Sequence, residues 1–370
     1  MKQDHKHTKN KHTSPFKVGS VFNPLRKRYS HCELKYKSVI IDYPTRLNAM
    51  AMDPSKIDMS RDFRYSPGEV VFSISLFKRI FVNKRSDSKI VVSINSKRIS
   101  LIKHAALLMK KALGFYEGFD IDVKNSEEIR HCGFGSSSGL ISSVACAINE
   151  AYGNPIDGNS LIKYLAQNHG EEIDGDISYL NPVQCIGGSA AAGICNSGLI
   201  LLAGESVPIA KMNIPHEYRI VLGIPKDLDD LDSSILMKKE MQCLNKFIKT
   251  GKKYGKVIAY NILHKMLPAM IEGDLKTVGD IIYEYRFEMG SIKNCSFTYK
   301  KLPKLCNELS FLKKDNVVEV LSISSVGPAI FAVTKNPDIC KKSFNAKGLK
   351  TFCFCINNNG YKVIKKISNR

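Results

Sequence analysis

The chain has 370 residues, 44% of them hydrophobic, which is enough apolar material for two domains with a sizeable core. Lys and Arg number 55 against 35 Asp and Glu, a formal net charge of +20. No apolar run approaches the roughly 18 residues that a membrane span needs, and the N-terminus is too polar for a secretory signal. We therefore expect a cytoplasmic chain with no membrane partner. Eleven cysteines without a Cys-x-x-Cys pair predict reduced thiols.

The excess positive charge is concentrated at the two ends of the chain. Residues 1–37 hold ten Lys or Arg against two acids, and residues 335–370 hold nine against one, which leaves only +4 between them. This distribution predicts a basic, disordered N-terminal tail at 1–37 and a basic C-terminal extension at 341–370. Basic and aromatic residues form no recognised nucleic-acid-binding motif, so no dedicated nucleic-acid partner is expected.

Hydrophobic periodicity predicts alternating strands and helices along the intervening residues. Strands are expected at 38–44, 70–81, 90–94 and 119–123, and helices at 101–113, 140–152 and 161–169. Strands at 199–203 and 218–224 bracket a Pro-containing connection, where we place the boundary between domains at 38–210 and 211–340. Helices near 232–249, 255–266 and 274–288 follow, then strands at 317–322 and 330–334. This order predicts an α+β fold of two domains.

The most informative segment is a glycine- and serine-rich loop, Cys132-Gly-Phe-Gly-Ser-Ser-Ser-Gly139, that leads directly into the predicted helix at 140–152. Such a loop lets the backbone approach an anion closely, and the first turn of the helix offers unpaired N–H groups and the positive end of its dipole. A polyphosphorylated ligand is therefore predicted here. The alternative is a glycine-serine turn that only caps a core helix.

The loop resembles the second motif of the GHMP kinase superfamily, named after galactokinase, homoserine kinase, mevalonate kinase and phosphomevalonate kinase. The usual form is Pro-x-x-x-Gly-Leu-Gly-Ser-Ser-Ala, and Phe134 here replaces the Leu. Tyr43-Pro-Thr-Arg-Leu-Asn48 resembles the first motif, and the segment 324–333 resembles the C-terminal glycine motif. The resemblance implies a two-domain GHMP-type fold, with a ribosomal-protein-like α/β N-terminal domain and a ferredoxin-like C-terminal domain.

Within the superfamily, the chain most resembles the β-ribofuranosylaminobenzene 5′-phosphate synthase branch, which joins phosphoribosyl pyrophosphate to a hydroxybenzoate-type acceptor. Ser324-Ser-Val-Gly-Pro328 is similar to that branch's Ser-Ser-x-Gly-Pro, and Leu267-Pro-Ala-Met-Ile-Glu-Gly-Asp274 to its Leu-Pro-Ala-x-x-Glu-Gly-Asp. The segment Tyr218–Pro225 also resembles its domain-entry strand. The Arg-rich run and the His-Gly-Gly of that branch are absent, with Asn196-Ser-Gly198 in their place, so a third branch with its own substrate stays open.

Acidic residues bear on the choice between a kinase and a synthase. Most kinases of the superfamily place a carboxylate beside the acceptor hydroxyl, just before a Gly-Gly strand, but no Asp or Glu occurs between Asp176 and Glu205. A kinase would have to recruit Asp174, Asp176 or Glu172 from the preceding loop, or act by positioning and electrostatics alone. The synthase interpretation is favoured on this point.

The predicted site combines the loop with these motifs. Catalytic roles are assigned to Arg46 and Lys56, which would neutralise phosphate charge, and to Asp174. Mg²⁺ would be held by Ser137 and Glu172, with Glu171 as the alternative carboxylate. ATP or phosphoribosyl pyrophosphate would be the co-substrate, and the residues expected to hold it are Gly133, Gly135, Ser136, Ser137, Ser138, Ser324, Ser325 and Gly327.

Three functions remain open from the sequence. A phosphoribosyl-type transferase predicts pyrophosphate release without ATP. An ATP-dependent small-molecule kinase predicts ADP formation. A relative without catalysis predicts binding of a nucleotide or partner without turnover. The acceptor is not readable, since fold does not fix substrate. An exposed sheet edge or helix face in the C-terminal domain would support a homodimer.

Overall fold

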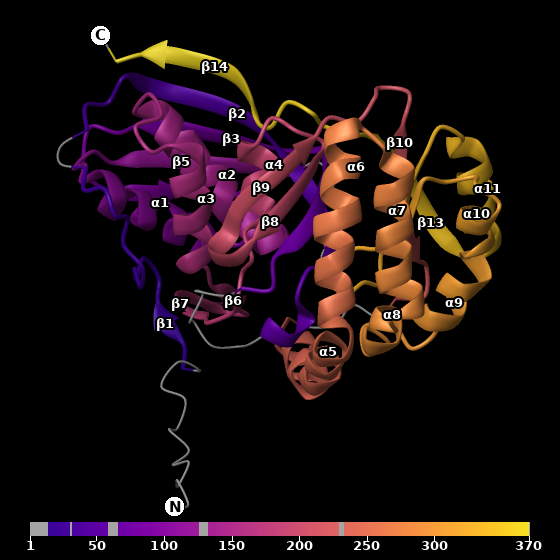
Figure 1. Ribbon diagram of the computed structural model, residues 1–370. Helices are drawn as coiled ribbons and strands as arrows, with labels where there is room; N and C mark the ends of the chain where they lie inside the picture. Colours follow the sequence, from indigo (N-terminus) through magenta and orange to yellow (C-terminus); the bar gives the residue numbers. More distant parts are fainter. Residues whose placement is uncertain (1–13, 30–31, 58–65, 126–131, 229–232, 370) are drawn as a thin grey trace, which may run out of the picture.

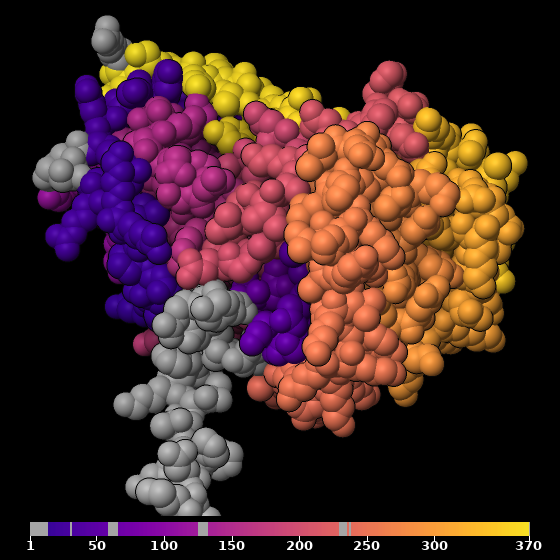
Figure 2. All heavy atoms as spheres, viewed as in Figure 1, coloured from indigo at the N-terminus to yellow at the C-terminus, as the bar shows by residue number. Residues whose placement is uncertain are grey.

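The computed structural model describes residues 14–29, 32–57, 66–125, 132–228 and 233–369. Two lobes, each built on its own sheet, pack side by side (Figure 1). In the space-filling view the orange C-terminal helices lie directly against the indigo and magenta N-terminal lobe (Figure 2). The α+β architecture with two sheets agrees with the prediction.

The N-terminal sheet is built around two long antiparallel strands, β2 (Tyr36–Ala51) and β3 (Glu69–Lys84). Its path runs β14-β2-β3-β5-β4, and β8 joins the first half of β3 with β9 beyond it. The predicted strand at 38–44 is therefore only half of β2, because the buried run continues past Pro44. The other strands are β4 (Ile90–Val92), β5 (Phe119–Asn125), β8 (Leu199–Ala203), β9 (Val207–Met212) and β14 (Lys362–Ser368).

Four helices cover one face of this sheet and bury the largest of three apolar clusters against it. They are α1 (Ile99–Leu113), α2 (Ser136–Ala151), α3 (Gly158–Gln167) and α4 (Gly188–Ile194). Almost every side chain of α2 is buried, which fits its lack of a polar stripe. The connection after β8 contains a short 3₁₀ turn, η3 (Gly204–Ser206). The buried α2 fixes the loop that precedes it.

The segment expected to be a disordered tail, 1–37, contains residues that pack into the N-terminal lobe. Phe16, 8% exposed, pairs with Leu180 in a small sheet of order β1-β7-β6. The Asn168 side chain accepts hydrogen bonds from the Phe22 and Asn23 N–H groups, at 2.6 and 3.1 Å. The prediction of a disordered tail at 1–37 is therefore wrong for these residues, because apolar side chains anchor this strongly basic segment to the lobe. The strands are β1 (Phe16–Lys17), β6 (Glu171–Ile173) and β7 (Asp176–Asn181).

The C-terminal lobe has a four-stranded antiparallel sheet of order β11-β12-β10-β13. One cluster of apolar side chains joins it to the N-terminal sheet, where the Phe72 and Phe331 rings meet edge to face at 5.8 Å. A further cluster is buried beneath the helices α9 (Leu302–Leu309) and α11 (Pro337–Ala346). The strands are β10 (Arg219–Pro225), β11 (Val320–Ile323), β12 (Ile330–Thr334) and β13 (Leu349–Cys355).

One prediction for the helices of this lobe is wrong, and the helices at 267–272 and after residue 288 were not predicted. Two helices were expected around Gly251 and Gly255, but α5 (Ser233–Asn261) runs through both. A Cβ at Gly251 would lie 2.1 Å from the Ser55 nitrogen, so this glycine permits close packing on η1 (Pro54–Lys56) and does not end a helix. The other elements are π-helical η4 (Ile262–Met266) and η5 (Glu284–Glu288), with α6 (Leu267–Glu272), α7 (Leu275–Tyr283), α8 (Ser291–Asn294), α9 (Leu302–Leu309), α10 (Phe311–Lys314) and α11 (Pro337–Ala346).

The predicted C-terminal extension, 341–370, supplies a strand to each lobe. Its first strand, β13, pairs with β10, and its last, β14, crosses back to lie beside β2 (Figure 1). Glu150 of α2 holds this return: it forms an ion pair with Lys366 and accepts a 2.7 Å hydrogen bond from the Tyr361 hydroxyl. Burial alone would raise the pKa of Glu150, but these bonds hold it below its usual value. All eleven cysteines are free.

Candidate functional site

The glycine-serine loop adopts a backbone that requires its glycines. Gly133 and Gly135 have φ values of 83° and 60°, in the left-handed region, and α2 begins at the next residue. A Cβ at Gly135 would lie 2.5 Å from the Ser189 hydroxyl and 2.7 Å from Arg46 Nε. Both positions therefore need glycine, because of their backbone conformation and because of the lack of space for a Cβ. Ser136, Ser137 and Ser138, in the first turn of α2, line the same cavity as the two glycines.

The C-terminal glycine motif bonds directly to this loop. The Ser324 hydroxyl donates to the Gly133 carbonyl at 2.7 Å, and the Ser325 N–H donates to the Asn48 carbonyl at 3.0 Å. The Asn48 N–H in turn donates to Ser324 Oγ at 3.2 Å. The three segments that the sequence analysis singled out, far apart along the chain, therefore meet at one place between the lobes.

A cavity of about 340 Å³ opens at this junction. Eight of the predicted site residues line it: Arg46, Gly133, Gly135, Ser136, Ser137, Ser138, Ser325 and Gly327. Ser324 does not line the cavity but supports its wall through hydrogen bonds to Gly133 and Asn48. Arg46 donates from Nη1 to the Gly133 carbonyl at 3.1 Å, whereas its buried Nε has no hydrogen-bond partner among the described residues. An unsatisfied cationic donor beside the loop suits an anionic ligand.

Two predicted catalytic residues do not line this cavity. Lys56 is exposed at the end of η1, and its carbonyl accepts a 3.2 Å hydrogen bond from Gln184. Asp174 is exposed in the turn between β6 and β7. The structure does not bring either side chain together with the loop.

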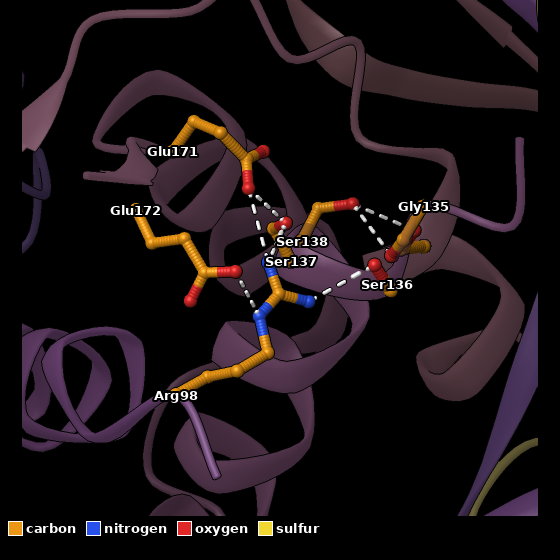
Figure 3. A network of polar contacts seen from close by, with 8 residues as sticks. Arg98, Gly135, Ser136, Ser137, Ser138, Glu171 and Glu172 are labelled. Atoms are coloured by element: carbon orange, nitrogen blue, oxygen red, sulfur yellow. Dashed lines mark hydrogen bonds and ion pairs between the residues drawn. The ribbon is translucent and has the colours of Figure 1, made fainter. Parts of the chain in front are cut away.

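The two glutamates of β6 take different roles around Arg98, a residue that the sequence analysis missed (Figure 3). Arg98 is 4% exposed; its Nε contacts Glu172 at 2.7 Å and its Nη2 contacts Glu171 at 3.0 Å. The same guanidinium donates to the hydroxyls of Ser136, at 2.9 Å, and Ser137. No motif marks Arg98, which precedes α1 with φ 62°, so only the folded arrangement reveals it.

Glu171, not Glu172, makes the contact with the loop. The Ser137 hydroxyl donates to a Glu171 carboxylate oxygen, and both residues line the cavity. Glu172 is turned to Arg98 and does not line it. Hydroxyl and carboxylate oxygens are the ligands that Mg²⁺ prefers, so the Ser137–Glu171 pair fits this ion. Within the described ranges, no group of three or more His, Cys, Asp or Glu residues is arranged to hold a metal.

A second network, also missed from the sequence, crosses between the lobes. Glu69, 2% exposed, accepts a 2.7 Å hydrogen bond from the Gly188 N–H and another from the Asn48 amide. Arg286, 3% exposed, donates to the Ala49 carbonyl at 2.6 Å and to Asn48 Oδ1 at 3.3 Å. Both charged side chains line the cavity. Arg286 thus reaches from η5 to β2 and adds positive charge to the wall.

Among the titratable groups in the cavity wall, His169 and Glu240 have strongly shifted pKa values. Burial, with the nearby charge of Arg98, lowers the pKa of His169 to about 4. Removal from water raises the pKa of Glu240 to about 7, and the negative charge of Glu171 adds to this rise. Glu240 lies in α5, in a Lys-rich stretch without any motif, so sequence reasoning did not find it. The cavity therefore holds carboxylates that the segment before the Gly-Gly strand lacks.

Comparison with known proteins agrees with this geometry. Residues 100–192 match the family model described as GHMP kinases N terminal domain. The chain is similar to the β-ribofuranosylphenol 5′-phosphate synthase of Methanothermobacter thermautotrophicus, with 22% identity over 311 residues, covering 80% of this chain and 88% of that protein.

Solved structures show the same fold. The galactokinase of Lactococcus lactis, complexed with galactose, aligns with a TM-score of 0.61 and 13% identity, over 88% of this chain and 95% of that one. The mevalonate-3-kinase of Thermoplasma acidophilum, with mevalonate 3-phosphate and ADP bound, aligns with a TM-score of 0.58 and 12% identity, over 90% and 99%. The chain thus carries a GHMP kinases N-terminal domain within a GHMP-type fold. The predicted superfamily, fold class and enzymatic nature are confirmed.

Across the described ranges, none of the helices combines the length and apolar character needed to cross a membrane.

Proposed function

We propose that the chain is a phosphoribosyl-type transferase, which binds phosphoribosyl pyrophosphate at the glycine-serine loop and joins its ribose to a phenol-type acceptor. The observation that carries this proposal is the sequence similarity to the ribofuranosylphenol 5′-phosphate synthase over 80% of the chain. The synthase-like segment Ser324–Pro328 adds support, because Ser324 bonds the loop directly.

The lining of the cavity includes groups suited to an anionic donor and apolar side chains suited to an aromatic acceptor. Around the loop lie the unsatisfied Arg46 Nε and the first turn of α2, both suited to phosphate. The rest of the wall includes apolar side chains that would receive an aromatic ring, namely Ile57, Leu236, Phe247, Phe297 and Val326.

Mg²⁺ would be held by Ser137 and Glu171 and would neutralise charge on the departing pyrophosphate. Arg98 would keep both ligands in place, since it donates to the Ser137 hydroxyl and pairs with Glu171. Arg46 would stabilise the same charge from the other side of the loop. The bond from ribose C1 to pyrophosphate would break and pyrophosphate would leave with the bonding electrons, while a ring carbon of the phenol-type acceptor would supply the electron pair of the new bond to C1 and lose the group it carried, which is CO₂ for 4-hydroxybenzoate.

A second candidate is an ATP-dependent kinase, favoured by the carboxylates Glu69 and Glu240 in the cavity wall and by the ADP-bound mevalonate-3-kinase of the same fold. The two candidates differ in donor. In the presence of Mg²⁺, calorimetric titration with phosphoribosyl pyrophosphate and separately with ATP should show preferential binding of the former. Incubation with 4-hydroxybenzoate should then release pyrophosphate without ATP. Preferential ATP binding with ADP formation would overturn the synthase proposal, and binding without turnover of any acceptor would point to a non-catalytic relative.

A further inference from the structure

A second cavity, of about 530 Å³, lies in the N-terminal lobe. It shares no lining residue with the cavity at the glycine-serine loop. Three parts of the chain surround it: the segment that follows β1, one side of α3, and the connection from β8 to β9. Figure 1 shows α3 and β9 side by side. This second cavity is therefore a separate place where a ligand can bind.

Hydrogen bonds and apolar contacts hold the segment after β1 in place. Asn168, which follows α3, accepts hydrogen bonds from the Phe22 and Asn23 N–H groups, and its amide donates to the Asn23 carbonyl at 2.9 Å. Leu25 and Tyr29 pack against the apolar core of the lobe. The three basic residues between Leu25 and Tyr29 are therefore held beside the cavity, although their composition is typical of a tail.

Cations predominate among the charged residues that line the second cavity. They are Arg26, Lys27 and Lys163, against one carboxylate, that of Glu205. Lys163 forms an ion pair with Glu205. Within the ranges that the structure describes, neither Arg26 nor Lys27 takes part in an ion pair. An anionic ligand would give these two cations a partner, and the guanidinium of Arg26 suits the geometry of a phosphate or carboxylate.

Aromatic and apolar side chains make up another part of the lining. Tyr29 and Tyr164 line the cavity together with Leu25 and Val207. Lys27 Nζ lies 5.0 Å from the centroid of the Tyr29 ring, so a positive charge and an aromatic face are neighbours here. A wall that combines apolar surface with a few polar groups is typical of a small-molecule site.

The turn that carries Glu205 has an unusual backbone. Glu205 and Ser206 both lie in the left-handed region, with φ values of 56° and 65°, although neither is a glycine. Such conformations are uncommon for residues with a side chain, and they are concentrated at binding and active sites. Here the turn brings the Glu205 carboxylate to Lys163 of α3, in the wall of the second cavity.

We propose that the second cavity binds a small anionic molecule that carries an aromatic ring, of the class of an aryl phosphate. Arg26 and Lys27 would bind the anionic group, and the ring would lie against Tyr29 and Leu25. Lys163 would be shared between the ligand and Glu205, so the carboxylate of Glu205 opposes the negative charge of the ligand. This proposal is independent of the donor that the glycine-serine loop binds.

The test is calorimetric titration of the full chain with phenyl phosphate in the absence of Mg²⁺. It compares Arg26→Ala with Arg28→Ala, which removes the same charge from an exposed residue of the same basic run that does not line the cavity. We expect Arg26→Ala to weaken binding about tenfold or more, since a hydrogen bond between charged groups contributes at least that factor. Arg28→Ala should change the affinity about twofold at most, because solvent and salt screen its charge.

Glu205→Gln should act in the opposite direction. It removes the negative charge that opposes the ligand and keeps the shape of the side chain, so phenyl phosphate should bind several-fold more tightly. Inorganic phosphate, which has no ring, should bind more weakly than phenyl phosphate. A residue with a purely structural role would not give changes of opposite sign in Arg26→Ala and Glu205→Gln. The thermal unfolding midpoint of each variant is measured beside its affinity.

Ser137→Ala separates the second cavity from the cavity at the loop, because Ser137 lines only the latter. Binding of phenyl phosphate that persists in Ser137→Ala and weakens in Arg26→Ala supports the second site. Binding that is lost in Ser137→Ala and kept in Arg26→Ala would overturn it, as would equal affinities of Arg26→Ala and Arg28→Ala. An affinity of Glu205→Gln no higher than that of wild type would contradict the role of its charge, and equal binding of the two phosphates would contradict the aromatic contact. Failure of the transferase assay would leave each of these outcomes unchanged.

Discussion

Substituting Gly133 by Ala should push the glycine-serine loop away from Ser324. Gly133 has φ 83°, and a Cβ there would lie 2.0 Å from the Ser324 carbonyl oxygen. Left-handed backbone costs an L residue about 1–2 kcal/mol, and overpacking a buried contact costs about 1–3 kcal/mol more. We therefore expect Gly133→Ala to lose roughly 2–5 kcal/mol of unfolding free energy. The affinity for phosphoribosyl pyrophosphate should fall with it, because the loop must shift.

Gly273→Ala is the matched control, because Gly273 has φ 77° and a Cβ there would meet nothing within 4 Å. It should lose only the backbone part, about 1–2 kcal/mol, and keep donor affinity. Urea unfolding followed by circular dichroism measures both, since the chain has no Trp to report by fluorescence. Equal losses in the two variants, with donor binding kept in both, would refute the argument that the loop is held against Ser324 by close packing.

Three other expectations follow from the site and its supports. Ser137→Ala should weaken calorimetric binding of Mg²⁺ and phosphoribosyl pyrophosphate roughly 10- to 100-fold, since it removes the hydroxyl proposed to contact the ion and an interaction with a charged group is worth about 1.5–3 kcal/mol; unchanged affinity would mean that the loop is only a helix cap. His169 has a pKa near 4 in the folded chain against about 6.5 unfolded, so the unfolded state binds the extra proton and stability falls as pH drops from 6.5 to 4. His169→Gln should remove up to about 1.4 kcal/mol per pH unit of that slope in urea unfolding, and a slope equal to wild type would contradict the assignment. Removing residues 1–37 should cost at least about 3 kcal/mol because Phe16 leaves the core, whereas removing 1–13 should cost little; equal stability of the two truncated chains would show that β1 contributes nothing.

The parts of the fold that the sequence predicted are those with local signals. The loop, the helix after it and the three motifs could be located because glycines and apolar spacing mark them, and the structure brings these motifs together. Contacts made only by folding were missed. Arg98 and Arg286 carry no sequence pattern, and their role appears only when β6 and β2 approach them.

Predictions from composition were wrong where one residue type can serve two physical purposes. Gly251 predicted a break in α5, but its lack of a Cβ serves packing on η1. The charge of residues 1–37 predicted a tail, but Phe16 and Leu34 are buried in the lobe. Glu240 was not predicted as a site residue, because a glutamate in a Lys-rich helix has the sequence pattern of an ordinary solvent-exposed residue.

Because β14 pairs with β2, the N-terminal sheet cannot be completed until β14 has been synthesised. The partner strand β2 is synthesised before the C-terminal lobe, whereas β14 is synthesised after it. Until then the outer edge of β2 lacks its neighbour and has unpaired backbone groups, which other chains could bind. The N-terminal lobe thus completes its sheet only after the C-terminal lobe has been synthesised. A gene fragment cut between the lobes should yield an aggregation-prone product, and supplying β14 as a separate peptide should improve its solubility.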